Sequence, residues 1–488
     1  MQSAASTHHD WVRSFVADMF RMTGSTFFGQ ALGLLAFLVM ARQLGPSVYG
    51  DWQTIQILAP FLGFVSLGAI QGLHRELPIL RGRAEAEQAA QVIRATFSFA
   101  GLASLLACLL ICVIVACGKI RQPFAFGLVG LALFCPFDTL GGVYGFVFRG
   151  ENRYDMLGRV NLVSGLSYVL YPALVAIWAF QGAVAAQVLS AVVVLVYSAM
   201  LYPFQYRFEL PWRLIRTQIA IGFPIMLLSA MSLVGRSVDR YLILAFMTPA
   251  HLGYYMAASL FFAPLNLIFN GLNAVLYTRQ GLSYGQNSAN PMPRHLVVRP
   301  IETMACILFP AAAAIAVGLP ELVKLILPKY SPGVVPAQVI LLGVAFYLTA
   351  STGASVLFVL GRAYSIYASY AVMFFLNASI GYFCLRQGWG LVGAAIGSAS
   401  GYIASGFVTA GLSMTALGLE PKEIRKTAAR ILGPFIWCVG VAAVLLFAFR
   451  HTPPSPLWFG AKMGLCVLAT AWVMWPTGSR IIRIIWPK

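Results

Sequence analysis

Charged residues are scarce in this sequence. Only 10% of its 488 residues are Asp, Glu, Lys or Arg, whereas a soluble globular protein carries about 25%. Hydrophobic residues make up 59% of the chain, and about fourteen apolar spans of ~20 residues each would use nearly all of them. This composition excludes an ordinary soluble enzyme and places the chain in a bilayer.

Sequence motifs for several kinds of chemistry are also absent. The chain has no Gly-x-x-x-x-Gly-Lys-Ser/Thr phosphate loop, which argues against direct use of ATP. None of His74, His251, His295 and His451 has a carboxylate and a serine near it in the sequence as a hydrolase triad would suggest. The eight cysteines lie inside apolar runs without metal-knuckle spacing, so we expect neither a metal site nor a disulfide framework. With no loop long enough for a separate catalytic domain, the sequence predicts no catalytic residues and no enzyme.

The apolar stretches predict an all-α polytopic membrane protein with about fourteen transmembrane helices. The first 20 residues lack an apolar core segment of their own, so they do not form a cleavable signal peptide. The predicted spans are 22–41, 52–73, 95–117, 124–148, 160–180, 183–203, 218–246, 254–277, 301–327, 336–360, 366–385, 391–415, 431–449 and 458–475.

Basic residues outnumber acidic ones, 33 to 15, which gives a formal net charge of +18. In a soluble chain this excess would suggest a nucleic-acid partner, but cytoplasmic loops of membrane proteins also retain Lys and Arg. Every second connection is basic, through Arg75, Arg81, Arg83 and Arg94; Arg149, Arg153 and Arg159; Arg207, Arg213 and Arg216; Arg279, Arg294 and Arg299; Arg362; and Lys422, Arg425, Lys426 and Arg430. Topology therefore explains the charge without nucleic acid, and both termini are predicted to be cytoplasmic.

Three turns of the first half recur in the same order in the second half. The pairs are Leu44–Gly50 with Met247–Tyr255, Arg149–Tyr154 with Gly361–Tyr364, and Gly182–Ala186 with Gly390–Ala395. They predict an N-terminal lobe at 1–217 (spans 1–6), a C-terminal lobe at 218–418 (spans 7–12), and two additional spans with a cytoplasmic tail at 419–488. Because six spans per unit is an even number, the lobes are parallel repeats, and a cavity is expected where they face each other.

The turn segments also carry a family resemblance. Ala41–Gly50, His74–Pro78, and Asp239–Leu242 leading to Gly253–Tyr255 resemble the O-antigen and exopolysaccharide flippases of the multidrug/oligosaccharidyl-lipid/polysaccharide superfamily. The resemblance implies that undecaprenyl-diphosphate-linked oligosaccharide moves from the cytoplasmic to the outer leaflet of a bacterial inner membrane by alternating access. It also implies a polysaccharide polymerase and a chain-length regulator as partners. We expect the protein to be a monomer.

A charged residue at membrane depth costs free energy, so such residues usually face a cavity or one another. Arg236, Asp239 and Arg240 in the seventh span have the i, i+3, i+4 spacing of one helix face. Asp239 can neutralise only one arginine, and guanidinium suits a diphosphate because its planar fork donates two parallel hydrogen bonds. This cluster predicts a cationic substrate site. The alternative is a salt bridge at the outer end of the helix with snorkelling arginines.

Asp138 lies near the middle of the fourth span, beside Pro136 and before Gly141 and Gly142. A broken helix there would expose carbonyl oxygens to an ion, so Asp138 is the candidate that couples Na⁺ or H⁺ to transport. No other cofactor is expected. The alternative is a hydrogen-bonded carboxyl or one at the lipid interface.

Two further polar sets lie in the apolar helices. Asn266, Asn270 and Asn273 form a stripe along the eighth span, which is suited either to sugar hydroxyls or to a neighbouring helix. Gln53 and Gln56 could likewise hydrogen-bond either sugar hydroxyls or a neighbouring helix. Glu321 and Lys324 are spaced i, i+3 near the outer end of the ninth span, and we expect them to form an ion pair at the membrane interface.

Other functions remain open. A lipid II flippase typically has an Arg-Asp pair in its first span, whereas Thr23–Met40 is uncharged. A multidrug exporter of the same superfamily would favour an acidic cavity, whereas the charges here lean basic. A membrane glycan polymerase or acyltransferase would need a catalytic set on a sizeable outer loop, which the sequence lacks.

Overall fold

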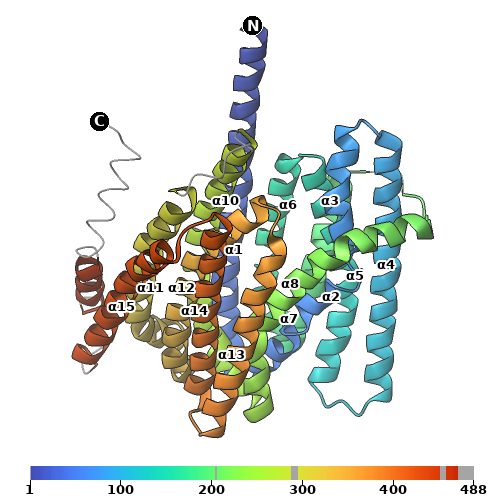
Figure 1. The fold of residues 1–488 in the computed structure, drawn as a ribbon. Helices are drawn as coiled ribbons and strands as arrows, with labels where there is room; N and C mark the ends of the chain where they lie inside the picture. Colours follow the sequence, from blue (N-terminus) through green and yellow to red (C-terminus); the bar gives the residue numbers. More distant parts are fainter. Residues whose placement is uncertain (1, 204–205, 287–294, 451–457, 471–488) are drawn as a thin grey trace. The chain divides into compact units, whose positions relative to one another are not determined.

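The computed structural model describes residues 2–203, 206–286, 295–450 and 458–470, and the regular secondary structure in these ranges is helical throughout (Figure 1). The predicted all-α class is confirmed. The α-helices are α1 Gln2–Gln56, α2 Ala59–Leu62, α3 Ala69–Gly82, α4 Ala86–Cys117, α5 Phe124–Gly150, α6 Tyr154–Ser167, α7 Leu170–Leu201, α8 Trp212–Phe246, α9 Pro249–Ser259, α10 Ala263–Gln286, α11 His295–Ile326, α12 Val334–Val359, α13 Ile366–Arg386, α14 Gly390–Ala416 and α15 Pro421–Ala448.

Within the described ranges, 11 helical segments are long and apolar enough to cross a membrane. Gly24–Leu62 and Tyr154–Leu201 each contain parts of two predicted spans, and a short apolar helix at Trp458–Thr470 matches the last one. The polytopic membrane fold is thus confirmed, and its apolar segments follow the predicted order along the chain.

Two residues with non-helical backbone angles interrupt these long segments. Gly45 in α1 has a φ of 73°, which glycine adopts without a Cβ clash, and Ala179 in α7 has a φ of 46°. The chain folds back beside Ala179. The fold-back brings Gly182 close to Leu174, and a Cβ at Gly182 would lie 2.1 Å from the Leu174 carbonyl oxygen. Both interruptions lie at or next to predicted boundaries between spans.

The chain divides into two compact units, Met1–Ala230 (unit 1) and Met231–Lys488 (unit 2). Unit 1 contains α1 to α7 and the first part of α8, and unit 2 contains the rest of α8 and the helices that follow. In unit 1, α5 packs against α4 and α7, and α1 packs against α6 and α7. In unit 2, α14 packs against α12 and α13, and α11 packs against α12 and α15.

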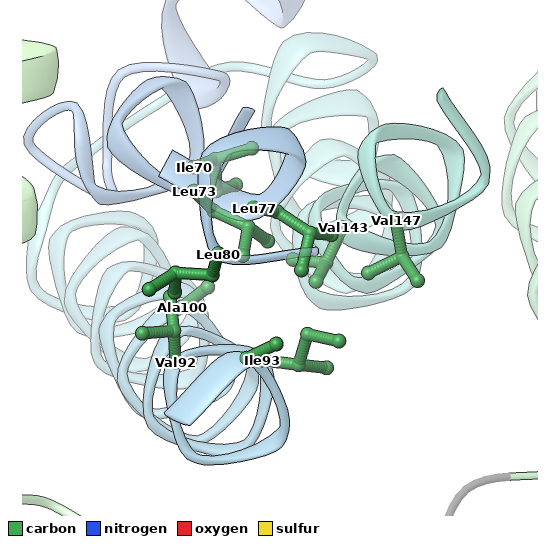
Figure 2. Close-up of a cluster of buried hydrophobic side chains, with 10 residues drawn as sticks. Ile70, Leu73, Leu77, Leu80, Val92, Ile93, Ala100, Val143 and Val147 are labelled. Carbon is green, nitrogen blue, oxygen red and sulfur yellow. The ribbon is translucent and has the colours of Figure 1, made fainter. Parts of the chain in front are cut away.

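A cluster of branched aliphatic side chains joins α3, α4 and α5 within unit 1. Figure 2 shows these side chains gathered between the three helices. Leu73, Leu77 and Ala100 are completely inaccessible to solvent. In lipid, close van der Waals packing holds such helices together, since the tails are as apolar as the side chains.

Glycine pairs bring helix backbones into direct contact in both units. In unit 1, a Cβ at Gly165 of α6 would lie 2.5 Å from the Cα of Gly29 in α1. In unit 2, a Cβ at Gly397 of α14 would lie 2.6 Å from the Cα of Gly381 in α13. Small residues at such positions let transmembrane helices approach closely.

We predict that Gly397→Leu destabilises unit 2, because the leucine would meet the α13 backbone, which has no room to move. Overpacking of this kind costs about 1–3 kcal/mol or more. Gly411→Leu is the matched control, since a Cβ at Gly411 on the same helix has nothing within 4 Å. The measurement is the melting temperature of each purified variant, and equal values for the two variants would contradict the packing described here.

Candidate functional site

Unit 1 contains a cavity of about 570 Å³ between α1, α5, α6 and α7. We call it the unit 1 cavity. Its wall on α5 includes Asp138, Gly141, Gly142, Gly145 and Arg149, whose spacing places them on one helix face. A Cβ at any of the three glycines would have nothing within 4 Å. Asp138 is an exposed side chain that lines this space.

Helix α5 runs from Phe124 to Gly150 without non-helical residues, although Pro136 lies inside it. The expected break beside Asp138 is therefore wrong. A continuous helix leaves no run of free carbonyl oxygens next to Asp138, so an ion there would depend on the carboxylate and on polar side chains of the cavity wall.

The other walls of the cavity carry amides and aromatic rings. The Nε2 of Gln56 donates a hydrogen bond to the Oε1 of Gln187 across 2.9 Å, which joins the end of α1 to α7. Phe37, Tyr168 and Tyr171 form an aromatic cluster, with the ring centroid of Phe37 5.6 Å from that of Tyr168 and 5.2 Å from that of Tyr171. The cavity thus offers hydrogen-bonding groups and flat apolar surfaces together.

The C-terminal end of the α5 wall is basic. The guanidinium of Arg149 lies 5.3 Å from the ring centroid of Phe146, and the ring centroid of His74 lies 4.9 Å from the same centroid. Partial burial, together with the nearby Arg149, lowers the pKa of His74. The lowered pKa keeps the imidazole neutral at pH 7, so Arg149 supplies the positive charge here.

The three charged residues predicted on α8 lie in unit 2. Asp239 is only 4% exposed, Arg240 is half-buried and Arg236 is exposed. Asp239 accepts a hydrogen bond from the Tyr255 hydroxyl and another, of 2.9 Å, from the backbone N–H of Arg240. Among the described residues, neither guanidinium forms an ion pair with Asp239 or with any other acid.

The arginines keep most of their hydrogen-bonding capacity. The Nε of Arg236 donates to the Ser232 carbonyl at 3.3 Å, one turn back on the same helix. The Nε of Arg240 is buried without a hydrogen-bond partner in the described structure. A buried donor without a partner costs free energy, and two guanidiniums without an ion pair keep this site cationic.

Tyrosines from three other helices surround this cluster. Tyr255 of α9 holds Asp239, while Tyr347 of α12 and Tyr402 of α14 lie within electrostatic reach of Arg236. The ring centroids of Tyr347 and Tyr402 are 5.5 Å apart. Sequence reasoning missed these tyrosines, because no local pattern marks a tyrosine whose partner lies on another helix.

The asparagine stripe lies on α10. Asn266 donates a hydrogen bond of 3.1 Å to the Phe262 carbonyl of the preceding turn. Asn270 is exposed, and the Oδ1 of Asn273 is buried with no hydrogen-bond partner in the described structure. No described hydrogen bond links these residues to Arg236 or Arg240. Asp138 belongs to unit 1.

The expected pair between Glu321 and Lys324 is wrong. Glu321 instead forms an ion pair with Lys462, which lies 141 residues away on the helix Trp458–Thr470. The Lys462 side chain is 8% exposed and also faces the Phe449 ring. Lys324 is exposed. The pair fastens the last described helix to α11.

We predict that Lys462→Met destabilises the protein by about 3–5 kcal/mol, because it leaves Glu321 as a buried charge without its partner. The double variant Lys462→Met/Glu321→Gln should recover most of that loss. Lys324→Met, the control, should change stability by less than about 0.5 kcal/mol. Melting temperatures of the purified variants test this, and a loss at Lys324 equal to that at Lys462 would refute the assignment.

Similarity to known proteins extends over most of the chain. Residues 39–332 match the family described as polysaccharide biosynthesis protein. The sequence has no match among curated proteins. Among solved structures, a lipid II flippase MurJ in an inward closed conformation has a TM-score of 0.73 at 14% identity, over 95% of this chain and 99% of its own.

Two other solved structures share the fold. An inward-facing multidrug resistance MATE transporter of the MOP superfamily has a TM-score of 0.65 at 15% identity, over 82% of this chain and 96% of its own. A MOP superfamily transporter from Pyrococcus furiosus has a TM-score of 0.59 at 15% identity, over 82% and 95%. Nearly all of the chain has the fold of the flippase MurJ, and more than half of it matches the family model, so the protein belongs to the polysaccharide biosynthesis protein family.

Proposed function

We propose that this protein is a flippase for undecaprenyl-diphosphate-linked oligosaccharide, an O-antigen or exopolysaccharide repeat unit. It moves the lipid from the cytoplasmic to the outer leaflet of the bacterial inner membrane by alternating access, with both termini cytoplasmic. No covalent bond changes. The lobes at 1–217 and 218–418 rock against each other, and a polymerase and a chain-length regulator act on the exported product.

The observation that carries the proposal is the unpaired cationic cluster on α8. Asp239 accepts hydrogen bonds from the Tyr255 hydroxyl and from a backbone N–H. Its carboxylate therefore forms no ion pair with the guanidinium of Arg236 or Arg240. A diphosphate carries the charge that two guanidiniums lack, and each planar fork donates two parallel hydrogen bonds to phosphate oxygens. The buried Nε of Arg240 would gain a partner in the bound state.

Membership of the family supports the same class of substrate. A polysaccharide biosynthesis protein with the fold of a MurJ lipid II flippase fits a carrier of lipid-linked glycans. An exporter of cationic drugs is expected to have an acidic cavity. The arginines of unit 2 therefore argue against that alternative. The asparagines of α10, with the Oδ1 of Asn273 unpartnered in the described structure, offer further hydrogen bonds to substrate.

Asp138 is the proposed coupling group. Its carboxylate makes no hydrogen bond or ion pair among the described residues and faces the unit 1 cavity. The wall there also carries the amides of Gln56 and Gln187. Their oxygens accept each other's N–H at 3.4 and 2.9 Å, and the second lone pair of each oxygen suits Na⁺, a hard cation. The donor set thus fits Na⁺, and the carboxylate alone suffices for H⁺. A bound cation would supply the positive charge that links an ion gradient to the conformational cycle.

We predict that Arg236→Ala and Arg240→Ala each reduce flipping about 10- to 100-fold, the loss expected for one hydrogen bond to a charged group. The measurement is the amount of full-length lipid-linked repeat unit left on the cytoplasmic leaflet of a deletion strain that expresses each variant. Arg425→Ala is the control, because Arg425 is exposed and its Nε also donates to the carbonyl four residues back, at 3.4 Å.

The deletion strain itself separates the alternatives. Accumulation of complete repeat units inside the cell supports flipping. If single repeats reach the outer leaflet and stay unpolymerised, the flippase assignment is wrong and a membrane polymerase takes its place. Normal relief of accumulation by both arginine variants, at wild-type membrane levels, would remove the cationic cluster from the mechanism.

We predict that Asp138→Asn abolishes the response of transport to an imposed ion gradient. Wild-type protein in proteoliposomes should transport faster when a Na⁺ or H⁺ gradient is applied, since the charged carboxylate senses the ion. The asparagine variant should transport at the same rate with and without the gradient. Asp155→Asn, at the first turn of α6, should behave as the wild type, and a gradient response retained by Asp138→Asn would contradict the assignment.

A further inference from the structure

We propose that the connection between α7 and α8 binds anionic phospholipids at the membrane surface that the sequence predicts to be cytoplasmic. The described part of this connection and the start of α8, residues 206–216, are called the linker segment. It belongs to unit 1. The inference goes beyond the proposed function and does not depend on the substrate. Contacts with α4, exposed aromatic side chains and arginines without an acidic partner carry it.

Polar contacts hold the linker segment on α4, and Figure 1 shows the start of α8 beside that helix. The guanidinium of Arg94 forms an ion pair of 3.1 Å with Glu209, the one acid of the segment. The backbone N–H of Glu209 donates a hydrogen bond of 3.2 Å to the Oγ of Ser98. Arg94 also pairs with Glu87 across 3.0 Å. One arginine of α4 therefore engages both acids of this region.

Aromatic contacts fix the depth of the linker segment. The ring centroid of Tyr206 lies 5.3 Å from that of Phe97, and the ring centroid of Trp212 lies 6.5 Å from that of Phe99. Both phenylalanines follow closely on the start of the predicted span 95–117. The segment thus lies where an apolar span meets the lipid headgroups, the level at which Trp and Tyr are enriched in membrane proteins.

Large apolar side chains of the linker segment are exposed at this depth. Phe208 is 62% exposed and Trp212 is 64% exposed, and Tyr206 and Leu210 are exposed as well. Apolar surface of this size costs free energy in water. At the headgroup level, an aromatic side chain buries its apolar body in lipid and keeps its polar edge hydrated. A lipid surface is therefore the favourable surrounding for these side chains.

The same segment carries positive charge without an acidic partner. Arg207, Arg213 and Arg216 are exposed, and none of them forms an ion pair within the described part of the chain. Arg216 is spaced i, i+3 from Arg213 and i, i+4 from Trp212, so the start of α8 groups two guanidiniums with one aromatic ring. A guanidinium donates two parallel hydrogen bonds to a phosphate.

This combination favours an anionic phospholipid over other acidic partners. A soluble acidic protein would match the arginines, but it would not reach aromatic side chains at the lipid boundary. Phosphatidylglycerol brings a phosphate for the arginines and acyl chains for Phe208 and Trp212. A zwitterionic lipid would bring its own cationic group toward the arginines, whereas each basic residue near an anionic leaflet adds attraction.

Trp212 serves as a native reporter of lipid contact. The full-length protein is reconstituted in bilayers that contain phosphatidylglycerol or phosphatidylcholine with brominated chains, which quench tryptophan fluorescence on contact. Subtracting the signal of Trp212→Phe from that of the wild type isolates this reporter. Trp178→Phe isolates a matched control, because Trp178 of α7 is 54% exposed and no Lys or Arg lies between residues 159 and 207.

We expect brominated phosphatidylglycerol to associate with the Trp212 site about five- to tenfold more tightly than brominated phosphatidylcholine. Trp178 should be quenched equally by the two lipids. The triple variant Arg207→Gln/Arg213→Gln/Arg216→Gln should lower the preference at Trp212 to below about twofold. The triple variant Arg83→Gln/Lys422→Gln/Lys426→Gln removes the same charge from exposed residues elsewhere and should keep the wild-type preference.

A second measurement needs no tryptophan substitution. The ratio of phosphatidylglycerol to phosphatidylcholine that stays bound to each purified protein is measured by mass spectrometry, and it should fall in the Arg207/Arg213/Arg216 variant alone. Equal quenching of Trp212 by the two lipids would overturn the proposal, as would no quenching by either, which would show that lipid does not cover the segment. An equal loss of preference in both triple variants would assign the effect to overall charge and refute the site.

Discussion

The cost of placing a charge among apolar helices governs this structure. In a bilayer a charged side chain must be paired, hydrogen-bonded or turned toward a polar space. The described acids within the helices of the core follow this rule in three ways. Glu321 is paired with Lys462, Asp239 is held by the Tyr255 hydroxyl and a backbone N–H, and Asp138 faces the unit 1 cavity.

The same cost explains why the two units differ chemically although both are built of packed apolar helices. Unit 1 encloses a nearly neutral space lined by amides and aromatic rings. Unit 2 carries two guanidiniums whose nearby acid is engaged elsewhere. Neither arrangement strengthens the fold, since a buried donor such as the Nε of Arg240 costs free energy while it has no partner. Groups that cost stability in the ligand-free protein are the ones that a ligand can satisfy.

The sequence predicted the elements of the fold better than their contacts. Hydropathy located the apolar spans because a bilayer demands ~20 apolar residues for each crossing, and the interruptions at Gly45 and Ala179 lie at or beside the predicted boundaries. Local spacing failed where the partner is distant in sequence: Glu321 pairs with Lys462 and not with Lys324. A charge pattern on one helix shows which residues need a partner, but tertiary packing decides which partner they receive.

The α8 cluster shows why that distinction matters for function. Read from the sequence, Asp239 should neutralise one of its neighbouring arginines, which would leave a single positive charge. The Tyr255 hydroxyl and the Arg240 N–H occupy the two carboxylate oxygens instead, so both guanidiniums stay available. One hydroxyl from a separate helix thus leaves the charge of the three side chains unchanged but keeps both guanidinium groups free to donate hydrogen bonds to a ligand. A diphosphate-linked substrate is the lipid whose charge such a site would complement.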